Sequence, residues 1–207
     1  MPVTHPSSIE EGIEALRSGE LVVYPTETMY GIAADPFSAG ALKRLFAVKG
    51  REALKAVAMI AADTETAFSL ARDVPPIARR LADCFWPGPL TLVMPARSDI
   101  APELVGAGGG VGVRVSPHPT ARALAAGFGK PITATSANRT GDPPAKTLAE
   151  ARKALGDKVK VYLEGGNLGV SAPSTVVEVV ESEWRIVREG AVSQRQIVAA
   201  LTGEALE

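Results

Sequence analysis

Hydroxyl and carboxylate side chains gather directly after a short apolar run near the N-terminus. Residues 21–24 read Leu-Val-Val-Tyr, which is typical of a buried strand. Pro25 would end that strand, because proline has no N–H group to continue a β-ladder. Three hydroxyls and a carboxylate then follow: Thr26, Glu27, Thr28 and Tyr30. Polar side chains at this edge of a sheet are where open α/β proteins bind ligands, although a self-hydrogen-bonded turn explains the same residues.

Further cations and hydrogen-bonding side chains recur where predicted helices and strands end. They are Lys49, Arg51, Lys55, Arg114, Ser136, Asn138, Ser174 and Arg188. Most have a structural explanation, since basic residues suit a helix C-terminus. Arg114, however, interrupts an apolar strand, where an unpaired charge is costly, so it must be paired or contact a ligand. Together these residues would suit a triphosphate, plus a small carboxylate held by a forked arginine.

Several common kinds of site are absent from the sequence. Neither G-x-x-x-x-G-K-[ST] nor G-x-G-x-x-G occurs, and there is no H-E-x-x-H, C-x-x-C or G-x-S-x-G. With only His5 and His118, a histidine-based triad or a multi-histidine metal site is disfavoured. We interpret His118, between two prolines, as a helix-start residue. Cys84, beside Phe85 and Trp86, is expected to be a buried structural thiol.

Composition narrows the class of protein. The 207 residues carry 22 basic and 23 acidic side chains, which disfavours a strongly electrostatic nucleic-acid binder. A single cysteine excludes an intrachain disulfide and fits a reducing compartment. No signal peptide is visible, and no apolar run reaches the roughly 18 residues of a membrane helix. We therefore expect a soluble, cytoplasmic protein of one domain.

Helix-like and strand-like segments alternate along the chain. Helices are expected between residues 8 and 19, 38 and 49, 63 and 70, 75 and 86, 120 and 128, 147 and 155, and from 193 onward. Strands are expected at 21–24, 57–60, 90–94, 111–115, 132–134, 159–163, 175–180 and 183–188, the last two as a hairpin. This order predicts an α/β domain with a mixed, twisted sheet flanked by helices.

Several short motifs, in this order and spacing, resemble those of the YrdC-like domain family. They are 25–31 (PTETMYG), 49–51 (KGR), 87–91 (PGPLT), 113–115 (VRV), 135–138 (TSAN), 174–176 (STV) and 188–190 (REG). The resemblance implies a YrdC-like domain over residues 8–201 and a C-terminal tail at 202–207. It is closest to the short, single-domain L-threonylcarbamoyladenylate synthases.

The resemblance also implies a reaction. L-Threonine and bicarbonate form N-carboxythreonine, whose carboxylate attacks the α-phosphate of ATP. Threonylcarbamoyl-AMP and pyrophosphate are the products, and tRNA-modifying transferase proteins pass the threonylcarbamoyl group to an adenosine in tRNA. The family uses no protein nucleophile. Mg²⁺ is expected to be held mainly by ATP phosphates and water, without a protein metal site.

Site residues follow from the same resemblance. The positions implied for threonine binding are Thr28, Arg114, Ala134 and Ser174. The positions implied for ATP binding are Lys49, Arg51, Lys55, Ser136, Asn138 and Arg188. Lys55 falls where the family often has asparagine.

The chain also departs from the family pattern. Arg51 is followed by Glu52-Ala53 where the family usually has proline, Ile60 replaces a frequent histidine, and Arg139-Thr140 follows Asn138. These differences leave open a paralogue that handles another carbamate. A non-enzymatic RNA-binding module is the weakest alternative, because the net charge is near zero.

Overall fold

The computed structural model describes residues 7–50, 56–169 and 171–204. The helices are α1 Ile9–Arg17, α2 Ala39–Lys49, α3 Thr64–Phe68, α4 Pro76–Phe85, α5 Pro119–Phe128, α6 Leu148–Leu155 and α7 Gln194–Thr202, with 3-10 turns η1 Pro102–Leu104 and η2 Gly156–Lys158. The strands are β1 Val22–Pro25, β2 Tyr30–Ala33, β3 Met59–Ala61, β4 Leu90–Pro95, β5 Gly110–Val115, β6 Ile132–Thr133, β7 Thr135–Ser136, β8 Val161–Tyr162, β9 Thr175–Val180 and β10 Glu183–Arg188.

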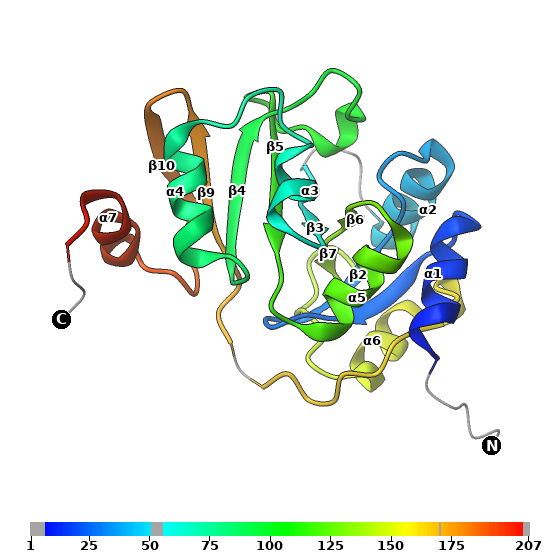
Figure 1. The fold of residues 1–207 in the computed structure, drawn as a ribbon. Coiled ribbons are helices and arrows are strands. Elements are labelled where there is room, and N and C mark those ends of the chain that lie inside the picture. The colour runs from blue at the N-terminus through cyan, green and yellow to red at the C-terminus, as the bar shows by residue number, and fades with distance from the viewer. Residues whose placement is uncertain (1–6, 51–55, 170, 205–207) are drawn as a thin grey trace.

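These strands form two mixed sheets, and the predicted α/β class is confirmed (Figure 1). One sheet has the order β7-β2-β1-β8 and the other has the order β10-β9-β4-β5-β3-β6. The sequence did not reveal β2 or β7. β2 pairs antiparallel with β1 as a hairpin around the polar turn, and β7 pairs with β2. The sequence predicted a single sheet, but the pairing of these short strands with β1 forms a second one.

Successive side chains along each strand of the six-stranded sheet point to opposite faces of the sheet. Leu90, Leu92 and Met94 of β4 point into the main core, as do Val111 and Val113 of β5. Helices α3 and α4 cover this face, and α7 packs on α4 (Figure 1). The alternate residues are left on the opposite face, toward the four-stranded sheet.

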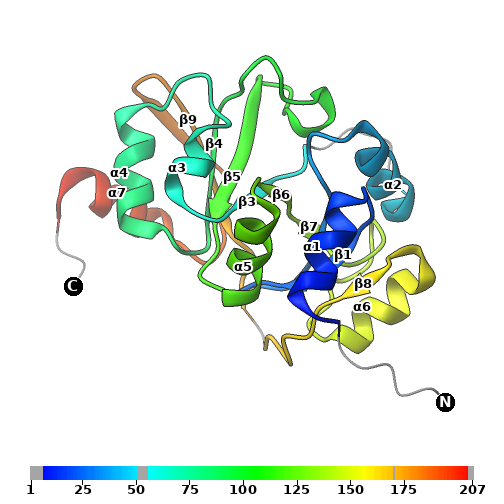
Figure 2. The same ribbon diagram turned by 45° about the vertical axis from the view of Figure 1, so that its right-hand side comes forward.

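Helix α5 joins the two sheets by packing against both β3 and β1 (Figure 2). His118 is its N-cap, with Nδ1 accepting a hydrogen bond from the Thr120 N–H at 3.2 Å. The interpretation of His118 as a helix-start residue is therefore confirmed. Capping boxes begin α1 (Ser8 with Glu11) and α6 (Thr147 with Glu150).

The prediction of a buried Cys84 is wrong, because the thiol is exposed. Helix α4 is amphipathic and turns Ala78, Leu81 and Ala82 inward, so position 84 falls on its solvent side. The aromatic residues next to Cys84 in the sequence therefore did not indicate whether its side chain is buried.

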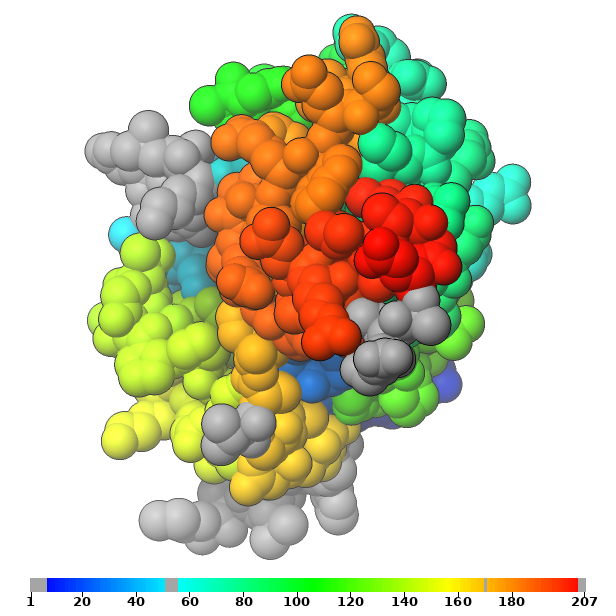
Figure 3. Space-filling view, turned by 90° about the vertical axis from the view of Figure 1, so that its left-hand side faces the viewer, coloured from blue at the N-terminus to red at the C-terminus, as the bar shows by residue number. Residues whose placement is uncertain are grey.

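An irregular connection runs from β8 at the four-stranded sheet to β9 at the six-stranded sheet. Figure 3 shows it in gold, below the orange β9–β10 hairpin. It passes so close to β1 that a Cβ added at Gly165 would lie 2.3 Å from the Pro25 Cβ. A glycine is therefore required where the connection crosses the polar turn.

Within the described residues, no helix is long and apolar enough to cross a membrane.

Candidate active site

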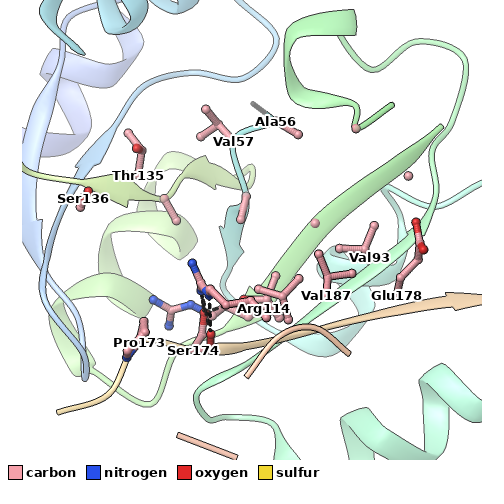
Figure 4. Close-up of a pocket in the computed structure, with 18 of the residues that line it drawn as sticks. Ala56, Val57, Val93, Arg114, Thr135, Ser136, Pro173, Ser174, Glu178 and Val187 are labelled. Atoms are coloured by element: carbon pink, nitrogen blue, oxygen red, sulfur yellow. Dashed lines mark hydrogen bonds between the residues drawn. The ribbon is translucent and has the colours of Figure 1, made fainter. Parts of the chain in front are cut away.

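A pocket of about 760 Å³ lies between the open face of the six-stranded sheet and the β1–β2 turn (Figure 4). Thr28 and Gly31 line it from the hairpin, and Ser136 lines it from the end of β7. Arg114 and Ser174 project into it from the six-stranded sheet side (Figure 4). Both sheets therefore contribute to one site.

Strand register places two arginines at the ends of one row across the sheet. Val176 of β9 is opposite Thr91 of β4 on one side and Arg188 of β10 on the other. β4 and β5 pair with Leu92 opposite Val113, so Thr91 and Arg114 are the next pair in that register. All four side chains of the row Arg114, Thr91, Val176 and Arg188 line the pocket.

A second row runs parallel to the first, two residues away on β4, β5 and β9 and three residues away on β10, where the pairing has a register shift. Val93 lies opposite both Gly112 and Glu178, and Glu178 lies opposite Arg185. Glu178 and Arg185 form a cross-strand ion pair. The glycine leaves the floor of the pocket flat beside valine side chains, which suits an apolar ring better than a charged group.

Arg114 is buried, and its charge is paired. Its Nη1 donates to Oε1 of Glu27, while the Ser116 hydroxyl donates to Oε2 of the same carboxylate. The side chains of Arg114 and Glu27 are 7% and 16% exposed. Nearby, burial raises the pKa of Tyr24, whose hydroxyl donates to the Thr133 carbonyl at 3.0 Å.

Arg188 contacts Ser174, which lies just before β9 and outside this row. Its Nη2 donates to the Ser174 carbonyl at 2.7 Å and to the Ser174 hydroxyl at 3.1 Å. The Ser174 hydroxyl also lies 3.0 Å from the Thr91 hydroxyl. Burial lowers the pKa of Arg188, and repulsion from Arg114 lowers it further.

The polar turn after β1 is held both from within and from outside. The Thr26 hydroxyl donates to the Met29 carbonyl at 2.7 Å and accepts from the Thr28 N–H at 3.2 Å. Lys146 Nζ donates to the Thr28 carbonyl at 2.6 Å, and the Ser171 hydroxyl donates to it at 3.0 Å. The turn is thus self-hydrogen-bonded and also forms one wall of the pocket.

Lys49 braces the turn that follows β7. Its ammonium donates to the carbonyls of Ser136 at 2.7 Å and Asn138 at 2.8 Å, and to Asn138 Oδ1 at 2.8 Å. Both Lys49 and Asn138 are buried, whereas Ser136 lines the pocket. The lysine therefore acts on the pocket through the turn that carries Ser136.

The residues singled out in the sequence thus fall into three groups. Six of them line the pocket: Thr28, Arg114, Ala134, Ser136, Ser174 and Arg188. Lys49 and Asn138 are buried next to Ser136, and Arg51 and Lys55 lie outside the described residues.

Sequence reasoning missed other contributors. Thr91 stood in a quoted motif without a role, although its two-residue spacing from Val93 placed both on one strand face. Lys146 and Ser171 carried no signal, because each acts on a backbone carbonyl distant in sequence.

Comparisons with known proteins agree on one family. The Sua5_yciO_yrdC family model, described as "Telomere recombination", matches residues 14–190. The threonylcarbamoyl-AMP synthase of Photobacterium profundum is 39% identical over 171 residues, covering 82% of this chain and 92% of that protein. The synthase of Chromohalobacter salexigens is also 39% identical, over 84% of this chain and 94% of its own length.

A solved structure agrees with these sequence matches. The crystal structure of P. abyssi Sua5 complexed with L-threonine has a TM-score of 0.89 and 33% identity, and covers 93% of this chain. This chain spans only 57% of the length of that Sua5 chain. The shared motifs, the shared fold and the extent of these matches lead to one conclusion: the chain belongs to the Sua5/YciO/YrdC family.

Proposed function

We propose that this protein is an L-threonylcarbamoyladenylate synthase, which makes threonylcarbamoyl-AMP and pyrophosphate from L-threonine, bicarbonate and ATP. The observation that carries the proposal is the cluster of Arg114, Thr91 and Ser174 facing Thr28 across one pocket. The relatives named threonylcarbamoyl-AMP synthase match this chain over most of its length, which supports the same activity here.

Threonine would bind at the centre of the pocket. Arg114 offers a guanidinium for the α-carboxylate, because a forked donor matches a carboxylate. Thr28, Ser174 and the backbone of Ala134 would surround the amino group and the β-hydroxyl. The row geometry supports this placement, since Ser174 stands beside Thr91, the neighbour of Arg114 in register.

ATP would extend to both sides of that centre. Its triphosphate would lie toward Ser136 and Asn138, on the turn held by Lys49, with Arg51 and Lys55 as further proposed contacts. Arg188 would contact the nucleotide near the α-phosphate. The flat glycine row, with its valine walls, would take the adenine ring.

The residues present fit Mg²⁺ only when the nucleotide supplies most of its oxygens. Among the described residues no group of three His, Cys, Asp or Glu side chains could hold a metal ion. Glu178, the acidic residue that lines the described pocket, is already paired with Arg185. We therefore propose that Mg²⁺ enters with ATP and offsets phosphate charge.

Catalysis would then consist of positioning and charge stabilisation. The carbamate oxygen of N-carboxythreonine attacks the α-phosphorus, a P–O bond forms, and the bond to pyrophosphate breaks. Arg188 and the turn braced by Lys49 would offset the charge on the phosphates. Substrates that fill a pocket between two sheets would also displace water from it, which would protect a labile carbamate.

The product would pass to tRNA-modifying transferase proteins in the cytoplasm. The decisive experiment incubates the protein with ATP and Mg²⁺ and measures pyrophosphate. We expect release only when threonine and bicarbonate are both present. Release that needs neither would contradict the proposal.

A paralogue acting on another carbamate is the second candidate. It is favoured by Ile60, a buried residue opposite Arg114 in register, where many family members have histidine. An amino-acid panel in the same assay separates the two. We expect threonine to be preferred to serine by about 1–3 kcal/mol for one methyl, and valine to be rejected far more strongly because polar groups stay unpaired. Equal turnover of valine would favour the paralogue.

A further inference from the structure

Glu27 has no role in the mechanism above, yet it makes the closest polar contact of Arg114. We propose that Glu27 is a positioning residue, which holds the Arg114 guanidinium in the orientation that receives the substrate carboxylate. The inference rests on the proposed function. It gives a role to the one carboxylate of the polar turn, which has no proposed contact with the substrates.

The carboxylate of Glu27 is anchored at both oxygens. Oε1 accepts from Arg114, and Oε2 accepts from the Ser116 hydroxyl. Ser116 Oγ in turn accepts from the backbone N–H of His118 at 3.2 Å. Ser116, directly after β5, therefore fixes the Glu27 carboxylate, and this carboxylate fixes Arg114, two residues before Ser116.

The place of Glu27 outside the pocket lining indicates that it positions Arg114 and does not compete with the substrate carboxylate. Arg114 is among the residues that line the pocket, whereas Glu27 is not, although its neighbours Thr26 and Thr28 are. Glu27 thus contacts the guanidinium without itself lining the pocket. Arginine has five N–H donors in a rigid fork, and the bond to Glu27 uses Nη1. Other donors of the fork remain available to a carboxylate in the pocket.

The contact between Glu27 and Arg114 also balances a buried charge. A guanidinium as buried as that of Arg114 is costly without a counter-charge, and repulsion between Arg114 and Arg188 adds to that cost. Glu27 offsets this charge before substrate arrives. The arginine is therefore preorganised and needs no rearrangement when the amino acid binds.

The test replaces Glu27 by an uncharged side chain of the same shape. For Glu27→Gln we expect the KM for threonine to rise roughly tenfold or more, because a disordered fork binds carboxylate poorly. The Kd of threonine, measured by calorimetry without ATP, should rise by the same factor. The KM for ATP should stay within about twofold, since the proposed phosphate contacts are elsewhere. Glu14→Gln, on the exposed face of α1, is the matched control and should behave as wild type.

Ser116→Ala keeps the charge of Glu27 but removes its anchor, together with the acceptor of the His118 N–H, so it provides a second test if Glu27→Gln does not fold. We expect a smaller change of the same kind, about threefold in the threonine KM. An unchanged threonine KM in both variants would overturn the inference alone. Tighter threonine binding would also overturn it, because Glu27 would then be a competitor. A wild-type protein that neither binds threonine nor releases pyrophosphate would overturn the proposed function, and this inference with it.

Discussion

The two walls of the pocket are built in different ways. The six-stranded sheet presents Arg114, Thr91 and Arg188 as alternate residues on strands whose other face packs in the core. The opposite wall consists of two turns, after β1 and after β7. Lysines hold these turns by donating to backbone carbonyls: Lys146 to Thr28, and Lys49 to Ser136.

This difference determines what a substitution should do. On the sheet wall, the backbone is fixed by ladder hydrogen bonds, so a changed side chain alters ligand contacts and leaves the shape intact. On the turn wall, the braces are side chains that hold backbone in place. Removing a brace should therefore impair substrate binding and folding stability together.

The largest effect is expected on the sheet wall, for Arg114→Lys. Lysine keeps the charge and can still face Glu27, but it loses the planar fork, so kcat/KM for threonine should fall on the order of 100-fold. The melting temperature should change little. Pyrophosphate release and a thermal melt check the two parts, with Arg195→Lys on the exposed face of α7 as control. A fully active variant would mean that Arg114 does not hold a carboxylate.

Most of the fold could be predicted because its signals are local. Ser8, Ser38 and Thr147 cap three helices that were expected to begin at these positions, and the strand around Arg114 lies where its apolar residues predicted it. β2 and β7 were missed for the opposite reason. Both are short, and β7 is defined by pairing with a strand about a hundred residues away.

The same distinction applies to the site. Arg114 could be predicted, since a charge inside an apolar strand needs an explanation from its own neighbours. Its partner Glu27 lies 87 residues away, and no periodicity connects the two. Lys146 is harder still, because its acceptor is a carbonyl, which every residue possesses. Contacts to backbone leave no pattern in the sequence.

A hydroxyl on the turn wall tests whether side chain and backbone can be separated there. Ser136→Ala should lower kcat/KM for ATP roughly tenfold, because one hydrogen bond to a charged phosphate is lost. The Lys49 contact to the Ser136 carbonyl remains, so unfolding free energy should fall by less than about 1 kcal/mol. Chemical denaturation measures the second quantity, with the exposed Ser98→Ala as control. A collapse in stability would identify Ser136 as a structural residue.

Removing a brace should instead affect both quantities. In Lys146→Met the Thr28 carbonyl loses its 2.6 Å donor and keeps the Ser171 hydroxyl. We expect about 1–2 kcal/mol less stability and a several-fold higher threonine KM. Lys153→Met, exposed on α6, controls for the loss of a charge. Lost activity at full stability would argue that Lys146 contacts the substrate directly, and would remove the contrast between the walls.

The smallest effect concerns pH, and it should not reach the pocket at all. His118 caps α5 through an unprotonated Nδ1, and burial lowers its pKa below the ordinary 6.5, against the opposing charge of Glu27. Because the unfolded chain then binds the proton more readily, the cap contributes fully above about pH 6.5 and is lost as pH falls below it.

Protonation of His118 should therefore lower the unfolding free energy by at most about 1 kcal/mol, the usual value of an N-cap. The comparison is with His118→Asn, because asparagine also caps helices and does not titrate. Wild type should lose stability relative to this variant between pH 7.5 and 5.5, as measured by urea denaturation at each pH. Parallel curves would show that the cap survives protonation. Helix α5 packs against both β3 and β1 but does not line the pocket. We therefore expect protonation to lower stability only, and the threonine KM of wild type should stay equal to that of the variant.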